Sequence, residues 1–481
     1  MAQPFEPFPL PSAAISPVNG KSRQGLDGRS PNGESVDEAQ VVRLIQRHVA
    51  KKLTDATRAH DITTGVPMSD AEREALTREL ITKALDDYSD ERMKGSPPRA
   101  PLHPQVESRV IRKVADSLMR AGGLQPLLDN DRVEEITADG CDIVHIRLDD
   151  GTIEQVAPIA DSDEDMVDLV RLLAARTGEE ERRWDRAAPI LNLQLPDGSR
   201  LNAVMAVSKR PSLSIRRHRY VKVTLDDLVR LGTLDTALRE LLAAAVRARL
   251  NIVVAGRVGA GKTTLLRGLA SQIPPHERLV TIEDTYELGL DVDRMVHPRV
   301  VALQVREANV EGEGTVDMAA LFRNALRMVP DRIIVGEVRG DETIPMLNAM
   351  SQGNDGSLST IHARSSAGVF RKLALYAAQS PERLDEATTN LHIAEGLDLV
   401  VHLGFAADGR RAVTSVREVI DADGLQVSSN EIFRPGPGPG GRAVPGAPVS
   451  TGTVAALEAH GFNPDLLRRA EGWWDQTRVR P

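Results

Sequence analysis

The chain has 481 residues, of which 41% are hydrophobic and 27% are charged, so it is a globular protein long enough for two or three domains. The formal net charge of −9 argues against a protein whose main task is to bind nucleic acid, because that binding needs a concentrated basic face. A single cysteine, Cys141, excludes an intramolecular disulfide, and no apolar run is long enough to span a membrane. We therefore expect a cytoplasmic protein with no direct membrane span.

The first 123 residues divide into a tail and a group of helices. Prolines recur through residues 1–34, which predicts a disordered tail. Capping boxes at 35–38 and 69–72 each precede apolar residues at helical spacing, and a third helix is expected over 104–119. We expect residues 35–123 to form a helical bundle that packs or docks partners and carries no chemistry.

Residues 124–223 mix strand and helix patterns. Apolar runs typical of strands lie at 133–137, 143–147 and 201–207, and an amphipathic helix is expected over 166–174. A further strand ends on Arg216 and Arg217. These residues predict a small N-terminal α/β domain.

A glycine-rich stretch joins an apolar strand at 252–255 to an apolar helix pattern. Its residues are Gly256, Arg257, Val258, Gly259, Ala260, Gly261, Lys262, Thr263 and Thr264. The glycines let backbone N–H groups turn toward phosphate oxygens, and the helix that follows adds its positive end. We expect Lys262 to reach the β- and γ-phosphates and the Thr263 hydroxyl to ligate Mg²⁺. The alternative is a tight glycine turn, which the full motif in this context disfavours.

Strand patterns at 279–282, 332–335 and 358–361 alternate with helices after this loop. That alternation is typical of a doubly wound, mainly parallel sheet, whose ligands lie at the carboxyl ends of the strands. We expect this domain over 224–433, followed by a flexible Gly/Pro linker over 434–450 and a short helical tail over 451–481.

Carboxylates follow two of these strands. Glu337 stands where a phosphate-loop enzyme holds a metal-site carboxylate, so we expect it to act on Mg²⁺ through water. Glu283, Asp284 and Glu287 end the neighbouring strand, and one of them is a candidate to polarise the attacking water. The alternative for these three is a solvated acidic turn.

Basic side chains complete the predicted hydrolytic site. His362 ends a strand and either contacts the γ-phosphate or links the site to the domain core; a purely structural role is the alternative. Four arginines are candidate γ-phosphate sensors, with surface ion pairing as the alternative. They are Arg200, Arg216, Arg306 and Arg323.

Four motifs in this order resemble the secretion and pilus-assembly ATPases of the type II/type IV secretion superfamily, and most closely the CpaF-like branch that serves tight-adherence pili. They are the loop at 256–264, the acidic box Thr281-Ile282-Glu283-Asp284-Thr285-Tyr286-Glu287-Leu288, the stretch 321–340 and the histidine box at 353–363. The stretch 309–314 also looks like this branch, and a weaker likeness extends back to about residue 123.

The resemblance implies a RecA-like ATPase core behind a small N-terminal domain, with ATP and Mg²⁺ bound between them. It implies a hexameric ring at the inner face of the membrane that powers pilus assembly or protein secretion through an inner-membrane platform protein. Carried onto this chain, Arg200 and Arg216 would reach the γ-phosphate, and Glu287 would activate water. The chain departs from relatives at Asn354, where many carry histidine, and at Arg257 and Val258 in the loop.

Two other functions compete with the motor. One is a nucleotide-gated scaffold that binds ATP and assembles with negligible turnover. The other is a DNA translocase of a conjugation-type system, which the acidic net charge disfavours.

Overall fold

A computed structural model of the chain describes residues 38–66, 68–94, 99–176, 184–217, 222–306, 313–437 and 441–468. The expected disordered tail at 1–34, most of the capping box at 35–38, the stretch 309–312 and the end of the helical tail lie outside these residues. The chain divides into two compact units at Gln125 and Pro126. No helix of the described residues has the length and apolar character needed to cross a membrane.

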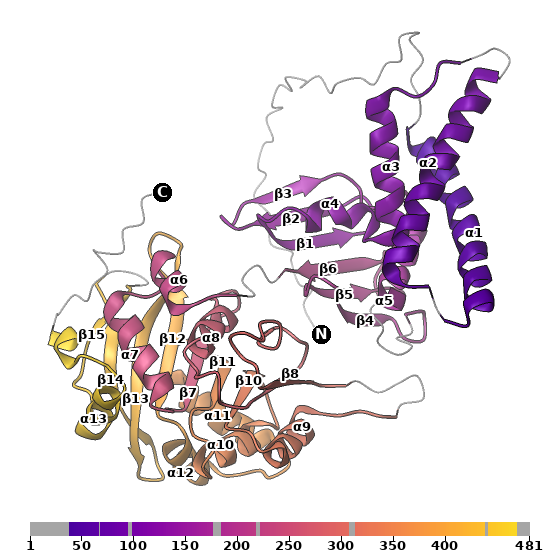
Figure 1. Cartoon of the computed structure of the whole chain (residues 1–481). Coiled ribbons are helices and arrows are strands. Elements are labelled where there is room, and N and C mark those ends of the chain that lie inside the picture. The colour runs from indigo at the N-terminus through magenta and orange to yellow at the C-terminus, as the bar shows by residue number, and fades with distance from the viewer. Residues whose placement is uncertain are drawn as a thin grey trace, which may run out of the picture. The chain divides into compact units, whose positions relative to one another are not determined.

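The first unit is a helical bundle of α1 (Glu38–Thr64), α2 (Asp70–Lys94) and α3 (Pro104–Met119), with a single 3₁₀ turn, η1 (Gly122–Leu124), after α3 (Figure 1). Apolar side chains three and four residues apart form its core, among them Val41, Ile45, Ile81 and Val110. The capping box at 69–72 and the third helix over 104–119 are as predicted.

The second unit begins with a six-stranded antiparallel sheet, in the order β3-β2-β1-β6-β5-β4. Its strands are β1 (Val133–Asp139), β2 (Val144–Leu148), β3 (Ile153–Val156), β4 (Ile190–Gln194), β5 (Arg200–Val204) and β6 (Ser212–Arg216). Two helices accompany them, α4 (Gln125–Leu128) and α5 (Asp163–Arg176). We call residues 126–217 the small domain. The strands β3 and β4 were not predicted, since β3 is largely exposed and lacks an apolar alternation.

Alternation along these strands gives the small domain one apolar and one polar face. Ile136, Leu201 and Ile215 are buried, and α5 buries one side through Met166, Val170, Leu173 and Ala174. On the opposite face, Glu135 is paired in register with Arg216, and Arg216 with Arg200. The polar face therefore carries both arginines that the sequence singled out in this domain.

The remaining residues form the core domain, residues 222–468, around a nine-stranded sheet in the order β15-β14-β13-β12-β7-β11-β10-β8-β9. Its strands are β7 (Ile252–Gly256), β8 (Leu279–Glu283), β9 (Val300–Gln304), β10 (Arg332–Val338), β11 (Leu358–His362), β12 (Leu399–Phe405), β13 (Arg411–Ala422), β14 (Val427–Pro435) and β15 (Ala443–Pro445). The six strands from β12 to β9 are parallel, and β13 to β15 extend the sheet antiparallel. This is the RecA-like, mainly parallel α/β fold that the sequence predicts.

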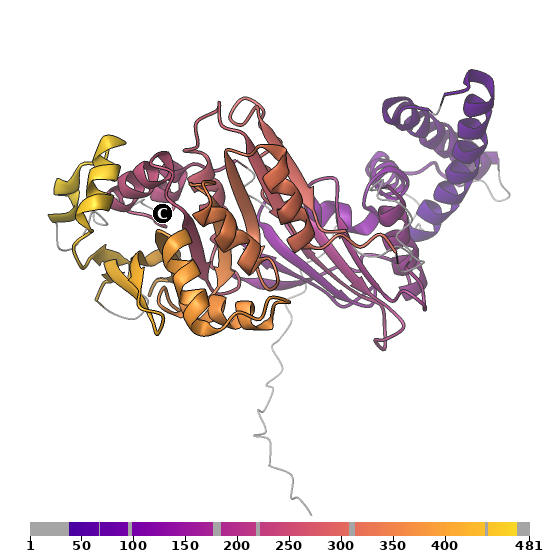
Figure 2. The ribbon, with the colours of Figure 1, turned by 90° about the horizontal axis from the view of Figure 1, so that it is seen from below.

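Helices cover both faces of the core sheet, as Figure 2 shows. They are α6 (Leu225–Arg230), α7 (Thr236–Arg247), α8 (Lys262–Ala270), α9 (Met318–Ala325), α10 (Thr343–Ser351), α11 (Gly368–Gln379), α12 (Glu386–Gly396) and α13 (Thr451–Ala459), with 3₁₀ turns at η2 (Leu326–Met328) and η3 (Pro464–Arg468). Ile252 and Val254 of β7 pack with α6, α7, α8 and α13, whereas Val253 and Ala255 pack with α9 to α12. Both faces of the parallel strands are buried, which explains their continuous apolar runs.

The carboxyl end of the core domain differs from the prediction. The expected linker over 434–450 includes the end of β14 and all of β15, which pair with each other. Prolines and glycines there suggested a flexible segment, but β15 is an edge strand, where proline is tolerated. Among the described residues, the expected helical tail is represented by α13 and η3.

Candidate functional site

The glycine-rich loop lies between β7 and α8, at the carboxyl end of the parallel strands. Gly259 and Gly261 have φ values of +74° and +91°, a left-handed conformation that strains any residue with a Cβ. Gly261 is the N-cap of α8 and supplies no side-chain acceptor to the first turn. Backbone N–H groups at that turn are therefore suited to an anion.

Register in the sheet brings two more predicted residues to the loop. His362 at the end of β11 is paired with Gly256, and Val338 of β10 is paired with Ile361. Glu337 is adjacent to Val338, at a point where the register of β10 and β11 shifts. Three strands that are far apart in sequence thus end side by side at the phosphate loop.

Lys262, His362 and Glu337 form a close cluster. The Lys262 Nζ lies 3.1 Å from His362 Nδ1 and 3.7 Å from Glu337 Oε1. His362 Nε2 lies 2.6 Å from the same Glu337 oxygen. The Lys262 and Glu337 side chains are 9% and 17% exposed, whereas that of His362 is 37% exposed.

Burial and mutual charge change the protonation of this cluster. Burial lowers the pKa of Lys262, while the negative charge of Glu337 opposes that change. Burial also lowers the pKa of His362, and the positive charge of Lys262 lowers it further. His362 is therefore neutral at pH 7, when it can accept a hydrogen bond at one nitrogen and donate at the other.

The carboxylate of Glu337 fits the metal role. Its Oε2 accepts two hydrogen bonds from Arg339, at 2.8 and 2.5 Å. Its Oε1 is buried and faces His362 Nε2 at 2.6 Å and the Lys262 Nζ at 3.7 Å. A buried acceptor beside Lys262, with the Thr263 hydroxyl in the first turn of α8, matches the oxygen ligands that Mg²⁺ prefers. No group of three or more His, Cys, Asp or Glu in the described ranges could hold a metal by itself.

The acidic box divides into residues with different surroundings. Glu283 is 2% exposed, and its Oε2 accepts hydrogen bonds from the N–H groups of Glu287 and Leu288, both at 2.8 Å. Burial raises the pKa of Glu283 to about 7. This geometry favours a structural role for Glu283, which holds the backbone of the acidic box at Glu287 and Leu288. The Glu287 carboxylate, in contrast, contacts the small domain: its Oε2 lies 3.7 Å from a terminal nitrogen of Arg200.

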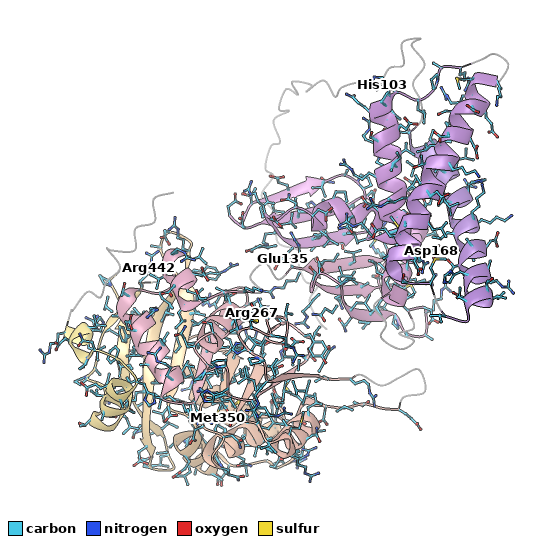
Figure 3. All side chains as sticks on the ribbon, in the orientation of Figure 1. His103, Glu135, Asp168, Arg267, Met350 and Arg442 are labelled. Carbon is cyan, nitrogen blue, oxygen red and sulfur yellow. The ribbon has the colours of Figure 1, made fainter. Side chains whose placement is uncertain are left out.

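The small domain contributes its arginines to the same region. Arg200 also lies 3.7 Å from Asp284 of the acidic box. The positive charge of Arg216 contributes to the lowered pKa of Lys262. A cavity of about 390 Å³ is lined by residues of β1, β4, β5 and β6 and by one residue of the acidic box. Its lining includes Glu135, Arg200, Arg216 and Thr285, and Figure 3 labels Glu135.

The other two candidate arginines take no part in this arrangement. Arg306 donates a hydrogen bond from its Nε to the Gly314 carbonyl, 2.6 Å away. Arg323 is exposed on α9. Within the part of the chain that the structure describes, both are exposed and neither contacts the cluster around Lys262.

Two arginines were missed by the sequence reasoning. Arg339 binds Glu337 and also lies 3.2 Å from Asp284. It stands two residues after Glu337, so the alternation of a strand was a signal that the two share a face. Arg267 of α8, labelled in Figure 3, donates to the backbone carbonyls of Glu287 and Leu288. No local sequence pattern indicates that contact.

A sequence profile described as "Type II/IV secretion system protein" matches residues 119–406. The chain belongs to this family. The match spans the small domain and most of the core domain, including every residue of the cluster described above. Its limits leave out the helices α1 and α2 and the strands β13 to β15.

Relatives within this family carry secretion and conjugation names. The conjugal transfer protein TrbB of Rhizobium radiobacter is 31% identical over 325 residues, which cover 66% of this chain and 92% of that protein. The type IV secretion system protein PtlH of Bordetella pertussis is 34% identical over 265 residues, 49% of this chain and 76% of that protein. Among solved structures, the VirB11 ATPase of the Brucella suis type IV secretion system, solved with sulphate, is 28% identical, with a TM-score of 0.33 over 64% of this chain and 96% of that one.

Proposed function

We propose that this chain is an ATP-hydrolysing subunit of a secretion machine. The observation that carries the proposal is the convergence of Lys262, His362 and Glu337 at the strand ends beside the phosphate loop. A site for phosphate alone would not need a neutral histidine and a carboxylate against the loop lysine. The names of the relatives support an ATPase of a type IV secretion system.

Each residue has a role that its position supports. The backbone of the loop and Lys262 hold the β- and γ-phosphates. Thr263 and Glu337 hold Mg²⁺, which neutralises charge on the phosphate oxygens. Glu287 orients the attacking water, and Arg200 and Arg216 stabilise charge on the γ-phosphate in the transition state. His362 senses the γ-phosphate through its contact with Lys262.

The proposed residues of the ATP site come from both the small domain and the core domain. Arg200 and Arg216 belong to the small domain, while the phosphate loop belongs to the core domain. Binding and splitting ATP between them would move one domain relative to the other. We propose that six copies form a ring at the inner face of the membrane and pass this motion to a platform protein. A tight-adherence pilus as the cargo system stays a prediction.

Phosphate release from the purified chain, measured with ATP and Mg²⁺, tests the proposal. Lys262→Ala and Glu337→Gln should each lower turnover at least about a hundredfold, because each removes a charge that meets the phosphates or the metal. Lys209→Ala and Glu395→Gln change the same residue types at exposed positions and should keep turnover within about twofold. Full turnover in both site variants would rule the proposal out.

The scaffold alternative predicts tight ATP binding with negligible phosphate release from the wild-type chain. Mass measurement with and without a non-hydrolysable ATP analogue on the same preparation then reports the ring. A hexamer that forms with the analogue supports the motor only if phosphate is also released. A hexamer without turnover supports the scaffold.

A role in conjugation is the second candidate, because several relatives are named conjugal transfer proteins. The motor proposal accommodates a conjugation machine as its cargo system. A direct DNA translocase would differ, since its ATPase should be stimulated by added DNA. We expect no stimulation, given the net charge of −9.

A further inference from the structure

One arginine outside the family match touches both the phosphate loop and the small domain. Arg411 is the first residue of β13, paired with Phe405 across the β12–β13 turn. Its Nε donates a hydrogen bond to the Gly259 carbonyl, 2.8 Å away. Its two terminal nitrogens lie 3.4 and 3.3 Å from the two oxygens of Glu134 on β1. One guanidinium therefore bridges residues that are far apart in sequence, with Arg411 and Glu134 separated by 277 positions.

The bond to Gly259 acts on the most constrained part of the phosphate loop. Gly259 and Gly261 both adopt positive φ, and a Cβ at Gly261 would lie 3.4 Å from the Arg411 Cδ. The arginine side chain thus packs along the stretch that presents N–H groups to phosphate. Fixing the Gly259 carbonyl also fixes the direction of the Ala260 N–H, because the two groups belong to one rigid peptide unit. Arg411 preorganises the loop for its anion.

The contact with Glu134 connects that loop to the small domain. The Glu134 side chain is 19% exposed and the Arg411 side chain is 40% exposed, so the carboxylate of the pair is partly removed from water while the guanidinium keeps contact with it. Glu134 immediately precedes Glu135, which is in register with Arg216 on β6. A shift of the phosphate loop is therefore transmitted through the two hydrogen bonds from Arg411 to Glu134. These bonds reach β1, which pairs with the strand that carries Arg216.

We propose that Arg411 is a positioning residue that couples the phosphate loop to the small domain, so that Arg200 and Arg216 are in place when ATP is bound. The inference rests on the proposed ATPase function. It assigns two separable effects to one side chain. The bond to Gly259 sets the affinity for ATP, and the pair with Glu134 sets the rate of the chemical step.

Two variants separate these effects. Arg411→Met keeps an unbranched side chain against Gly261 but has no donor, so the Kd for a non-hydrolysable ATP analogue should rise about fivefold and kcat should fall. Glu134→Gln leaves the bond to Gly259 intact, so Kd should stay within about twofold while kcat falls about fivefold. Arg410→Met is the matched control, since Arg410 is exposed on the adjacent turn, and it should alter neither quantity. Circular dichroism checks that each variant is folded.

The double variant decides whether the two residues act together. If Arg411 acts through Glu134, adding Glu134→Gln to Arg411→Met should not lower kcat further. Effects that multiply, or a Glu134→Gln chain with wild-type kcat, would overturn the proposal. Should Arg411→Met fail to fold, the split between kcat and Kd in Glu134→Gln still tests it. If the wild-type chain releases no phosphate, the proposed ATPase function is wrong. The Kd of Arg411→Met for the analogue would then still test whether Arg411 positions the phosphate loop.

Discussion

Replacing the buried Glu283 by glutamine should change how the stability of the core domain depends on pH. The Glu283 carboxyl is 2% exposed, and its Oε2 accepts from two backbone N–H groups of the acidic loop. The amide oxygen of a glutamine at this position can accept the same bonds, so the loop should keep its shape. What changes is the charge, because glutamine does not titrate.

The magnitude follows from the pKa. Burial raises the pKa of Glu283 from 4.5 to about 7 in the folded chain. The folded state then binds a proton more tightly than the unfolded state, so stability from this group is fully present below pH 4.5 and is lost as pH rises through about 7. A change of this size corresponds to about 3 kcal/mol of unfolding free energy. Relative to wild type, the Glu283→Gln chain should gain about that much between about pH 4.5 and about pH 8.

Urea titrations followed by circular dichroism, at a series of pH values, measure the difference in unfolding free energy between the two chains. Taking the difference cancels groups that titrate equally in both. Glu395→Gln, at an exposed position on α12, controls for the loss of one negative charge. A difference between wild type and Glu283→Gln that does not change with pH would refute the reasoning, since it would mean that the buried carboxylate is ionised without cost.

Two further changes test packing and backbone geometry. Arg332 is fully buried and donates two hydrogen bonds to Glu277, at 2.6 and 2.9 Å. Arg332→Met leaves the Glu277 charge buried without that partner, so it should lower the unfolding free energy by about 3–5 kcal/mol in a urea titration. An unchanged urea midpoint would contradict this. Gly259→Ala has open space for the methyl group but a φ of +74°, so it should cost about 1–2 kcal/mol and weaken ATP-analogue binding several-fold in a calorimetric titration. Gly151→Ala has the same strain in a hairpin turn of the small domain and should leave binding unchanged; equal binding losses in both would argue against a phosphate role for Gly259.

The sequence by itself determined the features that depend on local pattern. The phosphate loop could be recognised because its glycines, lysine and threonine must stand at fixed spacing between a strand and a helix. The alternation of strands and helices then predicted a parallel sheet, and parallel strands end at one edge. That rule was sufficient to expect Glu337 at the same edge as the phosphate loop, and it made His362, 100 positions after Lys262, a candidate for the same site.

Only the tertiary structure decided which charged side chains at that edge of the sheet are buried and which form ion pairs. Glu283 and Glu287 lie four residues apart in one acidic box, yet one is buried against backbone N–H groups and the other lies near Arg200. The strands β13 to β15 were not predicted, and with them the position of Arg411 was unknown. The physical reason is that burial and charge pairing depend on which distant strands pack together, whereas sequence spacing fixes only the neighbours along one strand or helix.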